Sequence, residues 1–198
     1  MTICSVDEGI TRAIDLIHTL HRTPVLIGIA GGSCAGKTLI AQQIATRVDG
    51  AILPLDDYYV GIDHIPDNNF DHPSAMELTL LKHHLHLLKQ GKPIHKPIYD
   101  FVTHKRVGYQ PFTPSHVIIT EGLYALHQMF RNILDIKIYV EAHTATRLAR
   151  RLARDMSERG RTRESVLRQW YTTVLPMHKT YVIHQKPHAD IIIINDGD

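Results

Sequence analysis

One eight-residue segment constrains the fold of this 198-residue chain more than any other. It reads Gly31-Gly32-Ser33-Cys34-Ala35-Gly36-Lys37-Thr38 and fits the pattern GxxxxGK[ST] at every fixed position. The continuously apolar run Val25–Ala30 precedes it, as is typical of a strand buried on both faces of a parallel sheet, and a helix is predicted from about Lys37. This order of strand, loop and helix predicts an α/β chain that binds phosphate groups.

The chemistry of phosphate binding explains the residues of this segment. Glycines let backbone N–H groups approach phosphate oxygens where a side chain would block them, and the helix N-terminus adds the positive end of its dipole. Lys37 is expected to reach the β- and γ-phosphates of a nucleoside triphosphate, and Thr38 offers a hydroxyl to Mg²⁺. Cys34 is either a small residue that fits the loop or a thiol activated by the helix N-terminus. All eight residues from Gly31 to Thr38 are predicted to bind the nucleotide.

Apolar runs and helical periodicities alternate along the rest of the chain. Five short apolar runs, separated mostly by helices, predict a five-stranded parallel sheet in a three-layer α/β sandwich of the P-loop NTPase type. We expect residues 1–198 to form a single P-loop kinase domain, because no repeat or flexible linker divides them. The predicted strands are Val25–Ala30, Ala51–Leu55, His116–Thr120, Ile136–Val140 and Asp190–Ile194.

Two further elements are predicted between the second and third strands. Ser74 and Glu77 form a capping-box pattern before an amphipathic helix that Gly91 ends. In residues 93–114, prolines and alternating apolar residues predict a small β-hairpin at a sheet edge. We interpret this hairpin as a flap on the substrate side.

Acidic residues follow two of the predicted strands, at the sheet edge where ligands bind in such folds. Glu121 comes directly after His116–Thr120 and is placed to hold a Mg²⁺-bound water. Asp56 follows the neighbouring strand, where a carboxylate can accept the proton of an attacking hydroxyl, a contribution typically worth ~10²–10⁴ in rate. Asp57 is expected to point elsewhere, because adjacent side chains on regular backbone diverge.

Arginines are concentrated in about residues 147–165, where we predict a helical lid with a turn at Gly160. Arginines that close over a γ-phosphate neutralise its charge, and one well-placed arginine is worth ~10³–10⁵ in rate. Arg154 and Arg159 approach this turn and are predicted to act in catalysis. Three other arginines are each expected on a solvated helix face: Arg147, Arg150 and Arg163.

Composition argues against several classes of protein. The 22 Lys+Arg and 20 Asp+Glu leave a formal charge of +2, too small for a protein that coats nucleic acid or binds a membrane through a basic surface. Two cysteines are too few for a disulfide framework, and no N-terminal signal or bilayer-length apolar run is present. We expect a cytoplasmic protein with no nucleic-acid or membrane partner.

Six short motifs follow one another along the chain. They are GGSCAGKT at 31–38, DDYY at 56–59, NFDHP at 69–73, PIYDFVTH at 97–104, EGL at 121–123, and TRLARR with SERGR between 146 and 161. With these motifs the chain resembles the uridine kinase (uridine–cytidine kinase) family of P-loop nucleoside kinases. The resemblance runs from about Val25 to Ile194, and so leaves out the loop and terminal helix with which relatives usually continue.

The resemblance implies that the chain transfers the γ-phosphate of ATP, with Mg²⁺, to the 5′-hydroxyl of uridine or cytidine in pyrimidine salvage. It implies that Asp56 is the general base and that Asp71 accepts both ribose cis-hydroxyls, while Tyr99 and His104 read the pyrimidine edge. It also implies a homo-oligomer, because the family tends to form tetramers. The further matches are apolar walls at Phe70 and Phe101, substrate contacts at Arg151, Arg161 and Gln169, and lid arginines at Arg154 and Arg159.

The sequence leaves other interpretations open. Another small-alcohol kinase with this core, such as phosphoribulokinase or pantothenate kinase, would give no reason for Tyr99 and His104 together. A non-catalytic nucleotide-binding homologue would also keep the phosphate loop, and Asp57 stands where the resembling family commonly has a small hydroxyl residue. His83 and His86 share a helix face that either binds a metal or is simply solvated.

Overall fold

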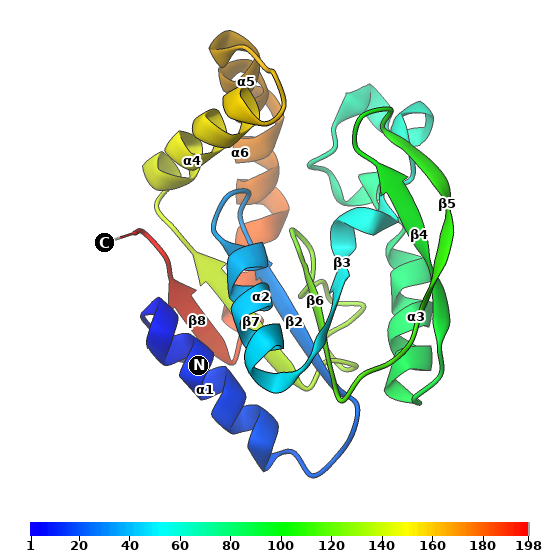
Figure 1. Ribbon diagram of the computed structural model, residues 1–198. Coiled ribbons are helices and arrows are strands. Elements are labelled where there is room, and N and C mark those ends of the chain that lie inside the picture. The colour runs from blue at the N-terminus through cyan, green and yellow to red at the C-terminus, as the bar shows by residue number, and fades with distance from the viewer. Residues whose placement is uncertain (198) are drawn as a thin grey trace.

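The computed structural model of the chain describes residues 1–197 and contains one parallel sheet of six strands (Figure 1). The strand order is β1-β8-β7-β2-β6-β3, with the phosphate-loop strand β2 near the centre. This confirms the predicted α/β class. The strands are β1 Thr2–Cys4, β2 Val25–Gly31, β3 Ala51–Pro54, β6 Val117–Gly122, β7 Ile136–Glu141 and β8 Ile191–Ile194.

The prediction of five strands was wrong by one edge strand. β1 pairs with β8, with Thr2 opposite Ile191 and Cys4 opposite Ile193. Only Cys4 of its three residues is buried, so the segment has neither the length nor the apolar run that marks the other strands in the sequence.

Helices cover both faces of the sheet and complete the three layers (Figure 1). On one face Ile10 of α1 and Ile40 of α2 pack with Ile27 of β2. On the other face Leu81 of α3 packs with Leu26 of β2, because alternate residues of a strand point to opposite sides. The helices are α1 Val6–Thr19, α2 Lys37–Val48, α3 Leu78–Lys89, α4 Thr144–Ser157, α5 Arg163–Gln169 and α6 Leu175–Met177.

The capping box predicted before α3 is absent. Ser74 lies in a separate 3₁₀ turn, and the N-cap residue Glu77 makes no side-chain capping bond. Its carboxylate instead accepts a hydrogen bond from Arg106 Nη1 at 2.6 Å. Gly91 follows the helix with φ of +71°, a left-handed conformation that suits glycine and ends the helix as predicted.

The predicted hairpin forms, but not at the edge of the main sheet. β4 (Ile94–Asp100) and β5 (Lys105–Phe112) are antiparallel and make their own two-stranded sheet. β4 packs against α3 and against the 3₁₀ turn η1 (Leu55–Tyr58), which directly follows β3. The edge of β3 therefore carries no hairpin strand, and the hairpin stands beside α3 (Figure 1).

The arginine-rich segment forms a helical arm above the phosphate loop. Gly160, with φ of +60°, lies in the turn between α4 and α5. The chain then returns to the sheet through a continuous helical stretch that includes two π-helical segments, Trp170–Val174 and His178–Val182. In Figure 1 this arm and the hairpin rise on opposite sides of the sheet end where β2 meets α2.

Candidate active site

The phosphate loop joins β2 to α2 in a conformation that requires its glycines. Gly36 has φ of +97°, in the region where residues with a Cβ are strained. A Cβ on Gly32 would lie 2.3 Å from Arg147 Nη1, so the loop backbone rests directly on that guanidinium. Lys37 Nζ donates to Gly32 O at 3.0 Å, which folds the lysine back over the loop. This cradle of backbone N–H groups fits the phosphate groups of a nucleotide.

Thr38 and Glu121 meet at the carboxyl end of the sheet. Thr38 Oγ1 donates to Glu121 Oε1 at 3.0 Å, and Glu121 is only 8% exposed. The two side chains offer adjacent oxygen atoms at the end of the phosphate loop. Because Mg²⁺ prefers oxygen ligands and keeps several waters, this donor set fits such a cation.

Asp56 lies in the 3₁₀ turn η1 and lines the same cleft as Lys37 and Glu121. Burial, together with the nearby Glu121 carboxylate, raises the pKa of this carboxyl from its ordinary value to about 6. The cations Lys37 and Arg159 act in the opposite direction. A carboxylate with a pKa just below neutral is suited to accept a proton at physiological pH.

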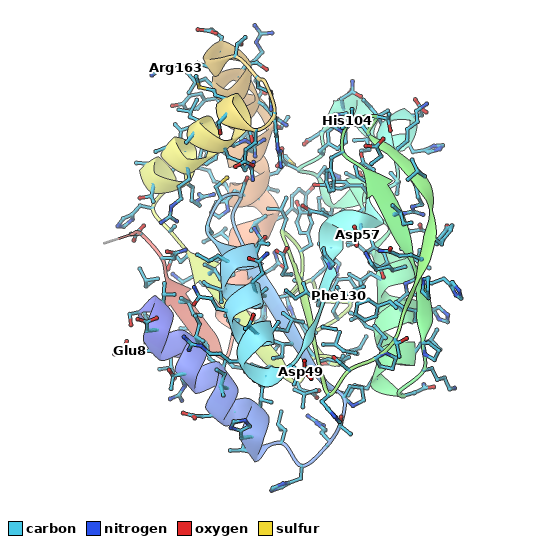
Figure 2. All side chains as sticks on the ribbon, viewed as in Figure 1. Glu8, Asp49, Asp57, His104, Phe130 and Arg163 are labelled. Carbon is cyan, nitrogen blue, oxygen red and sulfur yellow. The ribbon has the colours of Figure 1, made fainter. Side chains whose placement is uncertain are left out.

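Asp57 points away from the site, as the sequence predicted. Its carboxylate forms an ion pair with Lys96 of β4, where both side chains are largely buried. Figure 2 shows Asp57 on the side of the turn that faces the hairpin.

The hairpin and the loop after η1 supply a second group of residues to the cleft. Asp71 is 7% exposed, burial raises its pKa, and its Oδ2 accepts a hydrogen bond from Thr173 Oγ1 at 3.0 Å. The hydroxyl of Tyr99 is buried and has no hydrogen-bond partner within residues 1–197. The rings of Phe70 and His104 lie 5.0 Å apart, and His104 sits at the hairpin tip across from the arm that carries Arg163 (Figure 2).

A single cleft of about 1350 Å³ joins these groups. It contains every predicted site residue except Gly31, Gly32 and Ala35, which lie in the interior of the loop. The predicted residues that line it are Ser33, Cys34, Gly36, Lys37, Thr38, Asp56, Phe70, Asp71, Tyr99, Phe101, His104, Glu121, Arg151, Arg154, Arg159, Arg161 and Gln169. The structure thus places a phosphate loop at one end and an aromatic pocket at the other, with Asp56 in the same wall.

The arm arginines converge on one buried acid that the sequence analysis missed. Asp155 is fully buried, and its carboxylate lies 2.8 Å from Arg154 Nη2 and 3.3 Å from Arg151 Nε. The side chains of Arg159 and Arg161 each approach it to 3.6 Å. The i, i+4 spacing of Arg151 and Asp155 on α4, with Arg159 four residues further on, just after the helix, is the signal that would have found it.

Three predicted substrate contacts already hydrogen-bond to one another within the arm. Arg151 Nη1 donates to Ser33 Oγ of the phosphate loop at 2.7 Å, and its Nη2 donates to Gln169 Oε1 at 2.9 Å. The same Gln169 oxygen accepts from Arg161. Arg151 therefore connects the arm directly to the phosphate loop.

The expectation that Arg147 is solvated was wrong. It is 2% exposed, its Nε donates to Ala142 O at 3.2 Å, and its guanidinium lies 5.5 Å from the ring centre of Trp170. Burial lowers its pKa, and its charge together with Lys37 adds to the burial that lowers the pKa of His178 to about 4. Arg147 thus lies against the backbone of Gly32 in the phosphate loop rather than facing solvent.

Two negative findings concern the part of the chain that the structure describes. Residues 1–197 hold no group of three or more His, Cys, Asp or Glu side chains arranged to bind a metal. His84, between the two histidines considered for such a site, is buried and hydrogen-bonded to Tyr58 Oη at 2.7 Å. Within the same range, none of the helices combines the length and the apolar character needed to span a bilayer.

The fold and the phosphate loop define the chain as a P-loop kinase, and comparisons with known proteins specify its family. The profile of the Phosphoribulokinase / Uridine kinase family matches residues 26–197. The chain belongs to this family.

Curated relatives lie within the same family. A Staphylococcus epidermidis protein named uridine kinase is 43% identical over 182 residues, covering 87% of this chain and 88% of the relative. A uridine kinase of a Geobacillus species is 44% identical over 188 residues, covering 90% and 89%. A solved Bacillus stearothermophilus structure, described as a possible uridine kinase, has a TM-score of 0.72 at 17% identity and covers 95% of this chain and 98% of its own. That last likeness concerns the fold.

Proposed function

We propose that the protein phosphorylates the 5′-hydroxyl of uridine or cytidine with ATP and Mg²⁺, giving UMP or CMP. The observation that carries the proposal is the single cleft lined by Lys37 and Thr38 at one end, by Tyr99 and His104 at the other, and by Asp56. Relatives named uridine kinase at 43% and 44% identity support the same activity.

In the proposed reaction Asp56 accepts the proton of the nucleoside 5′-hydroxyl. The oxygen then forms a bond to the γ-phosphorus as the bond to the ADP oxygen breaks. Lys37, Arg154 and Arg159 neutralise the charge that spreads over the transferred group. When bound at Thr38 and Glu121, Mg²⁺ would supply further charge neutralisation at the phosphate oxygens.

The aromatic end of the cleft is assigned to the nucleoside. One oxygen of Asp71 is held by Thr173, while the other accepts no hydrogen bond from residues 1–197 and is assigned to the ribose hydroxyls. Tyr99, whose buried hydroxyl lacks a protein partner, and His104 are assigned to the pyrimidine edge, beside Phe70 and Phe101. A buried polar group without a partner favours a ligand that hydrogen-bonds to it, because an analogue that leaves the group unpaired binds less tightly.

The decisive experiment is a nucleoside-dependent ADP-release assay with Mg·ATP. Uridine, cytidine, ribulose 5-phosphate and pantothenate are compared at equal concentration. Turnover with uridine or cytidine is expected. Turnover only with one of the other two alcohols, or with none of the four, would contradict the proposal.

A further inference from the structure

No backbone ladder joins the hairpin to the main sheet, so side chains help to position it. At its tip there is one backbone hydrogen bond, from Ile62 N–H to His104 O at 2.9 Å. β4 and β5 pair only with each other, yet they carry Tyr99 and flank His104, the two residues assigned to the pyrimidine. Asp56 stands on a different element, the turn η1. The spacing between the nucleoside pocket and Asp56 therefore depends on what joins the hairpin to η1.

Charged side chains from both hairpin strands hold that turn. From β4, Lys96 forms its ion pair with Asp57, the residue next to Asp56, where the two side chains are only 13% and 16% exposed. From β5, Arg106 donates to Tyr59 O at 3.1 Å and to Glu77 at 2.6 Å. Shielding from water strengthens such pairs relative to exposed ones.

The same hairpin carries a further ion pair that serves as an internal comparison. Lys105 Nζ lies 3.6 Å from Asp63, but those side chains are 59% and 70% exposed. Asp63 belongs to the turn Ile62–His64 and does not line the cleft. It therefore offers the same charge chemistry without a connection to Asp56.

We propose that Asp57 and Lys96 are positioning residues, whose ion pair fixes the hairpin against the turn that carries Asp56 and so sets the distance between nucleoside recognition and proton acceptance. The inference rests on the proposed function, since it concerns the geometry of that reaction. It assigns a role to the one acid of the Asp56-Asp57 pair that does not face the cleft.

The pair also shapes the charge around Asp56. The charges that shift the pKa of this carboxyl are Glu121 of β6, Lys37 of α2, Arg159 of the arm and the adjacent Asp57, while the nearby tyrosines Tyr59 and Tyr99 are neutral groups whose own pKa values Asp56 raises. Glu121 and Asp57 raise its pKa, whereas Lys37 and Arg159 lower it. Lys96 offsets the charge of Asp57, so loss of either partner should move the pKa of Asp56, and in opposite directions.

The test is a double-mutant cycle of D57N, K96M and D57N/K96M, with D63N as the matched control and K96R as a charge-preserving variant. The single variants are expected to lower kcat/KM for uridine by ~10-fold or more, because small misplacements of reacting groups are costly. KM for ATP should stay within about twofold, since the phosphate loop is untouched. The double variant should be no worse than the poorer single, while D63N and K96R should stay within about threefold of wild type.

The dependence of kcat/KM on pH is a second measurement. If the role of the pair were purely structural, the acidic limb of this profile would stay where it is in wild type. It should shift down by about 0.3–0.5 pH unit in D57N and up by a similar amount in K96M. The inference would be overturned by single variants that keep the wild-type kcat/KM, or by a double variant whose loss is the product of the two single losses. It would also be overturned by an equal rise in KM for ATP, or by acidic limbs that shift in the same direction in D57N and K96M.

The two hypotheses fail in different ways. A wild-type protein that turns over neither nucleoside refutes the proposed function by itself. Hydrogen exchange of the β4 and β5 amides then tests whether the Asp57–Lys96 pair attaches the hairpin to η1. Faster exchange in K96M than in D63N supports the attachment, and equal exchange refutes it. If K96M shows no cooperative unfolding transition, D57N takes its place, because it removes the charge of the other partner. Its hydrogen exchange is then compared with that of D63N.

Discussion

Asp155, which is fully buried, accepts a hydrogen bond from Arg154 Nε at 2.9 Å. An arginine expected at the transferred phosphate is thus held by an acid of its own helix. One carboxylate faces four guanidinium groups and leaves a surplus of positive charge on the arm, which stands over the phosphate loop. The arm arginines therefore act as one ordered cationic group rather than as separate flexible side chains.

Asp155→Asn should lower both stability and turnover. Removing the charged partner of a buried ion pair typically costs about 3–5 kcal/mol, because the remaining charges are left uncompensated. For a domain of this size each kcal/mol corresponds to roughly 2–4 °C in the unfolding midpoint. The midpoint of thermal unfolding should therefore fall by about 6–20 °C, and kcat by ~10-fold or more as Arg154 and Arg159 lose their orientation.

Glu164→Gln is the matched control, because Glu164 is an exposed acid on α5 that makes no ion pair within residues 1–197. It should leave the unfolding midpoint and kcat unchanged. An Asp155→Asn protein that melts like the control would show that the four arginines are not held by this acid.

Asp56→Asn should abolish most turnover while making the protein more stable at pH 7. Asparagine cannot accept the hydroxyl proton, so kcat should fall by ~10²–10⁴. The folded-state pKa of about 6 lies above the ordinary aspartate value, so the ionised carboxylate of the native protein carries a cost of up to about 3 kcal/mol. Asparagine removes that cost.

The sign of this stability effect depends on pH. A raised folded-state pKa contributes stability that is fully present below about pH 4 and is lost as pH rises through about 6. The variant should therefore melt higher than wild type at pH 7 and alike at pH 4, as measured by calorimetry. A lower midpoint at pH 7 would mean that the Asp56 charge stabilises the fold.

The same pKa predicts the pH profile of the reaction. If Asp56 must be ionised to accept a proton, kcat/KM for uridine should fall tenfold per pH unit below about 6. Its plateau should extend through neutral pH, where Asp56 is ionised. A profile that is flat down to pH 4.5 would exclude Asp56 as the titrating base.

The sequence predicted the main sheet and the phosphate loop because both leave local signals. Buried parallel strands such as Val25–Gly31 appear as continuous apolar runs, and the loop needs fixed residues at fixed spacing. The edge strand Thr2–Cys4 left no such signal, because two of its three residues are not buried and its pairing with β8 joins opposite ends of the chain. Strand pairing across that separation depends on tertiary packing rather than on a local pattern.

Site residues could be predicted where the chemistry needs a particular residue type at the end of a strand. They could not be predicted where the role of a charged side chain depends on whether it is buried. Asp56 directly follows β3 and Glu121 lies near the carboxyl end of β6, and both line the cleft. The sequence around Arg147 and Asp155 is that of a solvated helix face, yet both are buried. Arg147 packs against Gly32 of the phosphate loop, and Asp155 lies among the arginines of the arm, where α4 packs against α5. Helical periodicity describes one helix at a time, so it cannot tell which charged face a neighbouring element covers.

Asp71→Asn should relax the choice between ribose and deoxyribose. Asp71 is nearly buried and has one oxygen held by Thr173, so a nucleoside without its 2′-hydroxyl leaves the other oxygen unpaired. Hydrogen bonds to a charged group contribute about 1.5–3 kcal/mol, so wild type should prefer uridine over 2′-deoxyuridine by ~10–100-fold in kcat/KM. In Asp71→Asn the kcat/KM for uridine should fall far more than that for 2′-deoxyuridine.

Thr173→Val is the matched control, because it removes only the internal hydrogen bond to Asp71. This variant should keep the preference for uridine. Equal kcat/KM for the two nucleosides in wild type would contradict the assignment of Asp71 to the ribose.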